Sequence, residues 1–279
     1  MNAEISHTTF LNQPAPTPTN NPLIIAHRGA SLIAPENTLA AFALAMESGA
    51  DGIELDVRLS RDGVPVVIHD ATLRRTGLCE ESVARMTAKQ LSEVDAGSWF
   101  NRAHPKHARE EYARECVPTL AQVSRLLRDR AARLYVEMKF GADEGFVDLT
   151  QAVARLIKEH KLHSRTVVVS FDLAAIAQIK HTDSAIRTGA LFEPKSDLTS
   201  VVRKQRMIKA AIAHGANEIL LHRSIATRSA VRQAIEADLS VVVWTVDDPK
   251  WIGRTRRAGI FALITNDPGQ MLSCQNRER

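Results

Sequence analysis

Cysteine is scarce in this 279-residue chain, and its few occurrences lie far apart. They are Cys79, Cys116 and Cys274, and none has the CxxC spacing of a metal or redox motif. An odd number of widely separated thiols argues against a disulfide framework and against a structural zinc site. A reducing compartment is the simplest interpretation, so we expect a cytoplasmic protein.

Aromatic residues and long apolar runs are also few. Aromatics make up 5% of the chain, and no arginine-rich or glycine-rich tract is interleaved with them, as a single-strand binding surface would require. No segment approaches the roughly 18 apolar residues of a membrane span, and the N-terminus has no signal-like leader. We therefore expect neither a nucleic-acid partner nor stable membrane insertion, and the sequence leaves a homo-oligomer open.

Charge of one sign is not concentrated in any block. The chain has 36 basic and 32 acidic residues, a formal net charge of +4, and this balance permits a small anionic substrate. Residues 1–21 are polar and contain several prolines, which predicts a flexible N-terminal tail. The 44% hydrophobic content is sufficient for a large core, so we expect residues 22–279 to form a single domain.

Short β-branched runs alternate with helical patterns after residue 22, which is typical of βα units. Candidate strands occur at 23–26, 52–57, 64–69, 134–138, 166–171, 187–192, 217–221, 241–246 and 261–265. The linker between the second and third is too short for a parallel crossover, so they should form an antiparallel hairpin that turns at Asp62-Gly63. Eight parallel strands remain.

Eight parallel strands with intervening helices predict an α/β fold, the (β/α)8 TIM barrel, in preference to an open doubly wound sheet. Helical patterns include 35–49, 119–132, 146–160 and 227–238. Residues 71–116 do not fit the repeat, so we expect a small inserted subdomain between strand 2 and helix 2, packed over one end of the barrel. Its Trp99 and Phe100 either close over a substrate or simply pack within the insertion.

Titratable side chains collect where the predicted strands end. The carboxyl ends of barrel strands share one mouth, and residues two apart on a strand share a face. The side chains brought together in this way are His27, Arg28, Glu54, Asp56, His69, Glu137 and Lys139.

Three of these side chains are carboxylates: Glu54, Asp56 and Glu137. At one mouth they would repel one another and raise their pKa values unless a cation neutralised them. Oxygen ligation without cysteine favours one divalent ion, Mg²⁺ or Ca²⁺, and the sequence does not separate the two. The alternative is an ordinary strand with solvated carboxylates, but apolar residues take every other position of the strand at 52–57.

Two histidines near a metal suit acid–base chemistry, because an unperturbed pKa near 6.5 can be tuned in either direction. Hydrolysis of a phosphodiester needs a base for the attacking oxygen and an acid for the leaving oxygen. We predict that His27 and His69 are the catalytic pair, without assigning which is the base. Arg28 and Lys139 are predicted to bind the non-bridging phosphate oxygens. The remaining histidines are expected to be ordinary core or surface residues.

The turn after the first strand carries further candidates. Glu36 and Asn37 either support the site, because they lie beside His27, or only mark a helix whose first turn contains Pro35. Gly29 should let the backbone turn closely beside a phosphate.

Several motifs then carry a family resemblance. In order they are "AHRGASLIAPENTLAAF", "GADGIELDVRLSRDGVPVVIHDATLRRTG", "VPTLAQV", "LYVEMK", "VVVSFD", "VVVWTVDD" and "ALITNDP". Over residues 23–270 this sequence resembles the glycerophosphodiester phosphodiesterase family, and the HRG…PENT and ExD…DGxxVVxHD pairing is highly specific. The resemblance implies a TIM barrel with an inserted subdomain. It also implies metal-dependent hydrolysis of glycerophosphodiesters, such as glycerophosphocholine or glycerophosphoethanolamine, to an alcohol and sn-glycerol 3-phosphate.

By motif match, the family's functional residues fall on the side chains that the strand ends collect. They are His27 and His69 for the acid and base, Glu54, Asp56 and Glu137 for the metal, and Arg28 and Lys139 for the phosphate. The attacking oxygen is either water or the glycerol 2-hydroxyl by way of a cyclic phosphate. Trp244 and Phe171, at strand ends, are either core residues or substrate-binding walls for the glycerol carbons.

Two short stretches depart from the family pattern. Thr76 stands alone where the family has a pair of threonines, and the family's TDxP reads Thr265-Asn266-Asp267-Pro268. Neither lies at a proposed metal ligand, so we expect effects on loop geometry and substrate preference. Two alternative functions remain open: hydrolysis of lysophospholipids in the manner of a lysophospholipase D, with the insertion as an apolar groove, and a non-catalytic barrel that binds phosphate esters.

Overall fold

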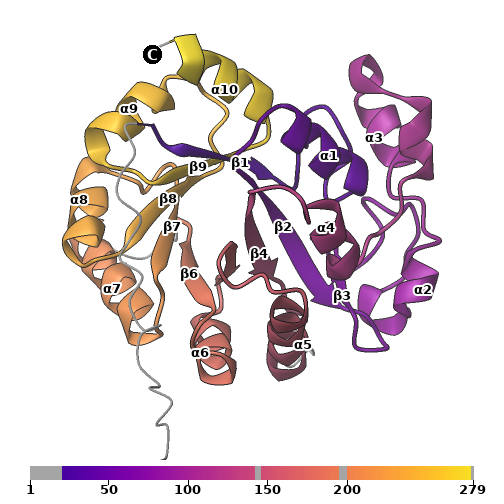
Figure 1. The fold of residues 1–279 in the computed structure, drawn as a ribbon, viewed down its shortest axis with the longest axis horizontal. Helices are drawn as coiled ribbons and strands as arrows, with labels where there is room; N and C mark the ends of the chain where they lie inside the picture. Colours follow the sequence, from indigo (N-terminus) through magenta and orange to yellow (C-terminus); the bar gives the residue numbers. More distant parts are fainter. Residues whose placement is uncertain (1–20, 142–145, 195–199, 278–279) are drawn as a thin grey trace, which may run out of the picture.

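A closed barrel forms the centre of the molecule (Figure 1). The computed structural model describes residues 21–141, 146–194 and 200–277, and the N-terminal tail predicted for residues 1–21 lies outside these ranges apart from Asn21. In the described ranges, eight parallel strands follow one another around the ring, and β1 closes it by pairing with both β2 and β9. The strands are β1 (Leu23–His27), β2 (Gly52–Leu59), β4 (Arg133–Met138), β5 (Thr166–Ser170), β6 (Arg187–Phe192), β7 (Glu218–His222), β8 (Ser240–Trp244) and β9 (Ala262–Thr265). The predicted TIM barrel is confirmed.

A short antiparallel strand, β3 (Pro65–Val67), lies beside β2. Val57 of β2 faces Val67, and Leu59 faces Pro65. The turn between the two strands contains Gly63, whose φ of 76° is in the left-handed region. The predicted hairpin is therefore confirmed.

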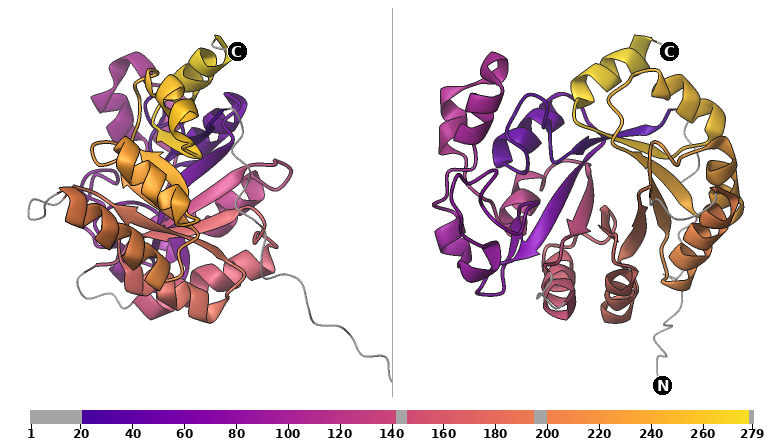
Figure 2. Two further views of the ribbon diagram at one scale, coloured as in Figure 1. Left: turned by 90° about the vertical axis from the view of Figure 1, so that its left-hand side faces the viewer. Right: turned by 180° about the vertical axis from the view of Figure 1, so that it is seen from behind.

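Helices surround the barrel on its outer side (Figures 1 and 2). They are α1 (Leu39–Glu47), α4 (Leu120–Leu126), α5 (Phe146–Glu159), α6 (Leu173–Thr182), α7 (Ser200–Ala213), α8 (Arg228–Glu236), α9 (Trp251–Ala258) and α10 (Pro268–Arg277). The expectation that Pro35 lies in the first turn of a helix is wrong, because Thr38 is the N-cap of α1. The Thr38 hydroxyl accepts from the Ala41 amide at 3.3 Å and donates to the Pro35 carbonyl at 2.7 Å.

Residues 71–116 lie beside α1 and α4 on the outside of the barrel (Figure 1). They contain α2 (Ala88–Leu91), α3 (Ser98–Ala103) and the 3₁₀ helices η1 (Val83–Arg85), η2 (Pro105–His107) and η3 (Glu110–Arg114). Phe100 is fully buried against Ala34, Ala41 and Tyr112. Trp99 packs edge-on against Phe100, with ring centroids 5.8 Å apart. Phe100 thus packs the insertion against α1 and the loop before it instead of closing over a substrate.

Alternation along the strands separates two environments. On β2, Ile53, Leu55 and Val57 belong to the core between sheet and helices, so the intervening Glu54 and Asp56 point into the barrel. Apolar side chains such as Ile25, Val167 and Leu220 fill the barrel interior.

The end of the barrel opposite the mouth is closed by a charged cluster. Glu218, the first residue of β7, is fully buried and accepts a hydrogen bond from the Tyr135 hydroxyl at 2.9 Å. Its carboxylate also forms ion pairs with Arg133 at 3.5 Å and Arg187 at 3.3 Å, the first residues of β4 and β6. This cluster closes the floor of the barrel.

Candidate active site

A cavity of about 390 Å³ opens at the carboxyl ends of the strands. Strand register brings the charged residues together, because His27 lies beside Glu54 on neighbouring strands and Asp56 lies beside Glu137. The charged and polar part of the lining is formed by His27, Arg28, Glu54, His69, Glu137, Lys139, Glu193 and Thr245. The apolar part is formed by Val169, Phe171, Leu191, Leu220, Trp244 and Ile264.

The three carboxylates predicted as metal ligands converge at one point. One oxygen from each of Glu54, Asp56 and Glu137 lies within 4.8 Å of the others, and all three residues are buried. Glu54 Oε1 has no hydrogen-bond donor among the described residues. A buried carboxylate oxygen without a donor is costly unless a cation binds it, so this oxygen-only cluster fits a hard divalent ion.

The pKa values of these carboxyl groups reflect their crowding. Burial and the neighbouring charges of Asp56 and Glu137 raise the pKa of Glu54 well above its ordinary value. Burial and Asp56 raise the pKa of Glu137 to about 7. Burial also opposes ionisation of Asp56, but Arg28 and Lys139 outweigh it and lower the pKa of Asp56 to about 2. Two of the three predicted ligands are therefore more readily protonated than an ordinary carboxyl group, and binding of a cation would release those protons.

Arg28 is held in an unusual conformation at the end of β1. Its φ of 55° is in the left-handed region, and its backbone amide donates to Glu54 Oε2 at 3.1 Å. Its guanidinium donates to Glu36 Oε1 at 2.9 Å and lies 3.0 Å from Asp56 Oδ2. The next residue, Gly29, has a φ of 84°, and a Cβ there would lie only 2.6 Å from the backbone of Ala41. This close approach to α1 requires glycine.

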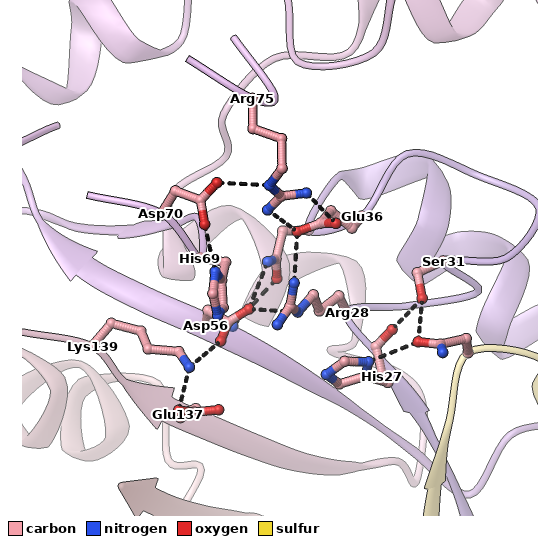
Figure 3. Close-up of polar contacts among 12 residues, drawn as sticks. His27, Arg28, Ser31, Glu36, Asp56, His69, Asp70, Arg75, Glu137 and Lys139 are labelled. Carbon is pink, nitrogen blue, oxygen red and sulfur yellow. Dashed lines mark hydrogen bonds and ion pairs between the residues drawn. The ribbon is translucent and has the colours of Figure 1, made fainter. Parts of the chain in front are cut away.

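Lys139 approaches the same carboxylates from β4. Its ammonium group lies 2.5 Å from Glu137 Oε1 and 3.4 Å from Asp56 Oδ1. The two cations predicted to bind phosphate thus contact the carboxylates predicted to bind metal (Figure 3).

The turn at Glu36 and Asn37 contacts the site directly. Asn37 has a φ of 59°, and its amide group donates to Asp56 Oδ2 at 2.9 Å. The Asp56 backbone amide donates in return to Asn37 Oδ1 at 3.3 Å. This reciprocal pair fixes the Asp56 carboxylate, so the turn contacts a predicted metal ligand, and its supporting role in the site stays a prediction.

The two histidines have different partners at Nδ1. His27 Nδ1 lies 2.7 Å from Asn266 Oδ1, whereas His69 Nδ1 lies 2.6 Å from Asp70 Oδ1. In each case the acceptor oxygen requires a proton on Nδ1 and leaves Nε2 free, and His27 Nε2 is 3.9 Å from Glu54 Oε2. Asn266 belongs to the stretch 265–268, which departs from the family pattern. This departure therefore affects a residue that contacts a predicted catalytic histidine, in addition to the geometry of the loop.

The environment lowers the pKa of both imidazoles. Burial and Arg28 lower the pKa of His27 to about 4. Burial, Arg28 and Lys139 lower the pKa of His69, while Asp56 and Asp70 oppose that shift. At Nδ1, therefore, His69 has a carboxylate partner, whereas His27 has an amide oxygen.

Phe171 and Trp244 form an aromatic wall of the cavity. Their ring centroids are 5.6 Å apart in an edge-to-face arrangement, and His222 makes a second edge-to-face contact with Trp244 at 5.3 Å. The Lys139 ammonium lies 5.6 Å from the centroid of the Phe171 ring. Both rings lie at the cavity as predicted, whereas their role toward a substrate stays a prediction.

Sequence reasoning missed a second layer of charges. Arg75 connects Glu36 and Asp70, and through them it is linked to Arg28 and His69 (Figure 3). The sequence "LRRTG" contains this arginine, but nothing in it distinguishes Arg75 from the adjacent Arg74. Only the fold shows which one reaches the site.

The fold and the site define an α/β-barrel enzyme whose mouth is equipped for an anionic substrate. Residues 27–270 match the model of the glycerophosphoryl diester phosphodiesterase family, and the chain belongs to this family. It is 32% identical over 251 residues to the glycerophosphodiester phosphodiesterase of Caldanaerobacter subterraneus subsp. tengcongensis, covering 90% of this chain and 96% of that one. The chain is thus a phosphoric diester hydrolase that acts on glycerophosphodiesters.

Solved structures support the same assignment. A phosphodiesterase from Oleispira antarctica, in complex with the product sn-glycerol-3-phosphate, aligns with a TM-score of 0.79 at 26% identity, covering 92% of this chain and 97% of that one. The glycerophosphodiester phosphodiesterase from Agrobacterium tumefaciens aligns with a TM-score of 0.74 at 26% identity, covering 90% and 99%.

Within the described part of the chain, no helix combines the length and apolar character that crossing a membrane requires.

Proposed function

We propose that this enzyme hydrolyses glycerophosphodiesters of cationic alcohols, such as glycerophosphocholine or glycerophosphoethanolamine, to the alcohol and sn-glycerol 3-phosphate. The observation that carries the proposal is the meeting of two histidines with a buried three-carboxylate cluster in one cavity. The product bound to the Oleispira antarctica relative is consistent with glycerol phosphate as the part of the substrate held at the site.

Glu54, Asp56 and Glu137 would hold one divalent ion, Mg²⁺ or Ca²⁺. When bound, the ion would neutralise the carboxylates and polarise a phosphate oxygen. Arg28 and Lys139 lie beside this cluster, where their charges would hold the non-bridging oxygens and stabilise the charge that develops in the transition state.

We assign His27 as the base and His69 as the acid. The neutral amide of Asn266 gives a positive imidazolium at His27 less support than a carboxylate would, so His27 stays unprotonated and can accept a proton at Nε2. Asp70 supports a positive charge on His69, and a bound phosphodiester anion would support it further. His69 Nε2 would then donate its proton to the leaving alcohol oxygen.

The apolar part of the cavity accounts for the remainder of the substrate. Phe171 and Trp244 offer faces for the glycerol carbons. Glu193 lines the same cavity and forms no ion pair with another described residue, so its carboxylate could attract a cationic head group.

A substrate panel tests the proposal. The wild-type enzyme, treated with EDTA and then supplied with Mg²⁺ or Ca²⁺, is assayed on glycerophosphocholine, glycerophosphoethanolamine, glycerophosphoglycerol and a lysophospholipid. We expect one of the two ions to restore hydrolysis, with the cationic head groups preferred. Restoration by neither ion would contradict the metal site, and preference for the lysophospholipid would replace the substrate class.

Two variants test the histidine roles in the same assay. His27→Ala and His69→Ala should each lose about 10²-fold or more of the activity, because each removes a proton-transfer group. Unchanged turnover in both variants would contradict the assignment, and no turnover in the wild type would favour a binding barrel. Rapid quench for a cyclic glycerophosphate distinguishes the glycerol 2-hydroxyl from water as the attacking group.

Three further expectations from the sequence remain proposals. They are the cytoplasmic location, the division into a tail and one barrel domain with residues 71–116 inserted, and the homo-oligomer left open above. The three cysteines are free in the structure, which is consistent with the first of these.

A further inference from the structure

Arg75 contacts two carboxylates that the proposed chemistry does not use directly. Its Nε donates to Asp70 Oδ2 at 2.7 Å. Its Nη1 and Nη2 donate to Glu36 Oε2 and Oε1, each at 2.8 Å. The planar guanidinium is therefore fixed by three hydrogen bonds, two of which form a bidentate pair with a single carboxylate.

Each of these carboxylates in turn holds a predicted functional residue. Asp70 Oδ1 accepts from His69 Nδ1 at 2.6 Å, and Glu36 Oε1 accepts from Arg28 Nη1 at 2.9 Å. One guanidinium thus lies a single side chain away from both the proposed acid and a proposed phosphate ligand (Figure 3).

We propose that Arg75 is a positioning residue that orients His69 through Asp70 and Arg28 through Glu36. This inference rests on the proposed function for those two residues. Without Arg75, the histidine is the one partner that Asp70 keeps among the described residues, and Asp70 can rotate away from it because its side chain is 28% exposed. In the same part of the chain, Glu36 would keep Arg28 alone, so its carboxylate would be held from one side instead of two.

The insertion holds Arg75 in place. The Arg75 guanidinium lies 5.7 Å from the centroid of the Trp99 ring, in cation–π contact. The Trp99 indole donates to the Ala96 carbonyl at 2.9 Å, and its ring packs on the buried Phe100. The insertion therefore contributes to the site by fixing an arginine rather than by placing an aromatic ring over the substrate.

The adjacent arginine is a matched control. Arg74 donates to Glu80 through Nε and Nη2 at 2.6–3.0 Å, and its side chain is 74% exposed. The two arginines are adjacent in the sequence but pair with different carboxylates: Arg74 with Glu80, and Arg75 with Asp70 and Glu36. Loss of Arg74 should leave the site unchanged.

The test measures kcat and KM of Arg75→Met, Arg75→Lys and Arg74→Met in the full-length, metal-loaded enzyme. Glycerophosphocholine is compared with the p-nitrophenyl ester of glycerol phosphate, whose leaving group departs without an acid. For Arg75→Met we expect kcat on glycerophosphocholine to fall by about 10- to 100-fold, as for partners that orient catalytic ligands. The kcat of Arg75→Met on the nitrophenyl ester should fall much less, because that leaving group needs no acid. The KM should rise on both esters, because Arg28, a proposed phosphate ligand, is less well positioned.

Arg75→Lys should fall between the wild type and Arg75→Met, because lysine keeps the charge and loses the fork geometry. Arg74→Met should match the wild type. Equal loss of kcat on the two esters, with a wild-type melting temperature, would show a merely structural role and overturn the proposal. Wild-type kinetics in Arg75→Met would overturn it as well.

A second readout separates this inference from the proposed function. If the wild-type enzyme cleaves neither ester, the proposed function is wrong. The orientation of His69 by Arg75 through Asp70 can still be tested with the ring ¹⁵N resonances of His69. These resonances should change in Arg75→Met and stay in place in Arg74→Met. Unchanged resonances in both variants would overturn the positioning role.

Discussion

At the scale of single residues, the two histidines of the site differ in what holds them. An amide oxygen of Asn266 fixes the ring of His27, and a carboxylate of Asp70 fixes the ring of His69. The two acceptors determine the same tautomer but support a positive ring to different degrees. This difference, more than the position of either histidine along the chain, is the basis for the proposed assignment of His27 as the base and His69 as the acid.

Asn266→Asp should therefore change the pH dependence of the reaction. A carboxylate beside His27 raises its pKa, now lowered to about 4, by about 1 to 3 units. A base works only when unprotonated, so the acidic limb of kcat/KM against pH should move to higher pH. Asp70→Asn is the matched change at His69, and it should instead move the alkaline limb to lower pH. If Asn266→Asp moved the alkaline limb and Asp70→Asn moved the acidic limb, His27 would be the acid and His69 the base.

At the scale of elements, the insertion depends on one aromatic cluster. Phe100 of α3 is fully buried against Tyr112 of η3 and against Ala34 and Ala41, which lie on either side of Glu36 and Asn37. The Tyr112 hydroxyl donates to the Ile33 carbonyl at 3.1 Å and ties η3 to the loop before α1. The stability of the insertion and the shape of the site are therefore connected through this loop.

Phe100→Ala should lower the free energy of unfolding by about 3–5 kcal/mol, the usual cost of removing a buried phenylalanine ring. Urea unfolding followed by circular dichroism measures this change. Leu32→Ala, a truncation on the same loop at a residue that is 45% exposed, serves as the control and should change stability by less than about 0.5 kcal/mol. Similar losses in the two variants would contradict the role of the cluster.

Much at the element scale could be predicted from the sequence. The period-two alternation of β2 correctly placed Glu54 and Asp56 inside and the apolar residues outside, because one face of each strand must pack against helices. The start of α1 was mistaken, since proline is compatible with a first turn but the threonine cap at Thr38 determined the start.

At the scale of the whole molecule, the floor of the barrel holds a fully buried carboxylate, Glu218, paired with two partly buried arginines. Glu218→Ala would leave Arg133 and Arg187 without their carboxylate and the Tyr135 hydroxyl without its acceptor. Loss of one partner from a buried ion pair costs about 3–5 kcal/mol, and urea unfolding should show this loss. The kcat/KM value should stay at the wild-type level, because this cluster lies at the end of the barrel opposite the mouth. A fall in kcat/KM at unchanged stability would contradict this separation.

Metal binding should stabilise the enzyme more as pH rises. The folded-state pKa of Glu137 is raised to about 7 from an ordinary 4.5. Protonation of Glu137 therefore stabilises the metal-free fold fully below pH 4.5, and this stabilisation is lost as the pH rises through 7. A cation binds the deprotonated form, so the melting temperature gained on adding Mg²⁺ or Ca²⁺ should grow between pH 5 and pH 7 and then level off. Differential scanning fluorimetry measures this gain. Glu137→Gln, which does not titrate, should show a weaker pH dependence, and an equal dependence would contradict this origin.

The meeting of the seven charged residues of the candidate site could be predicted from the sequence, whereas the residues that support them could not. Strand ends and register follow from local patterns, so the seven predicted charged residues meet as expected. Asn266 contacts His27 directly, and Arg75 is linked to His69 through Asp70. The positions of Asn266 and Arg75 depend on the closing of the ring by β9 and on the packing of the insertion. Such contacts arise from tertiary structure and cannot be predicted from the spacing of residues in the sequence.

Asp56 and Glu137, two of the predicted metal ligands, are also the ion-pair partners of Arg28 and Lys139. We therefore expect binding of the ion and binding of phosphate to be coupled. A divalent ion on Asp56 and Glu137 competes with both cations for the same oxygens, and so leaves more of their charge for a phosphate. Binding of the ion and of glycerol phosphate should then strengthen each other by the same factor, because linkage is reciprocal. Calorimetric titration of each in the presence and absence of the other measures that factor, and a value of one would show that the two bind independently.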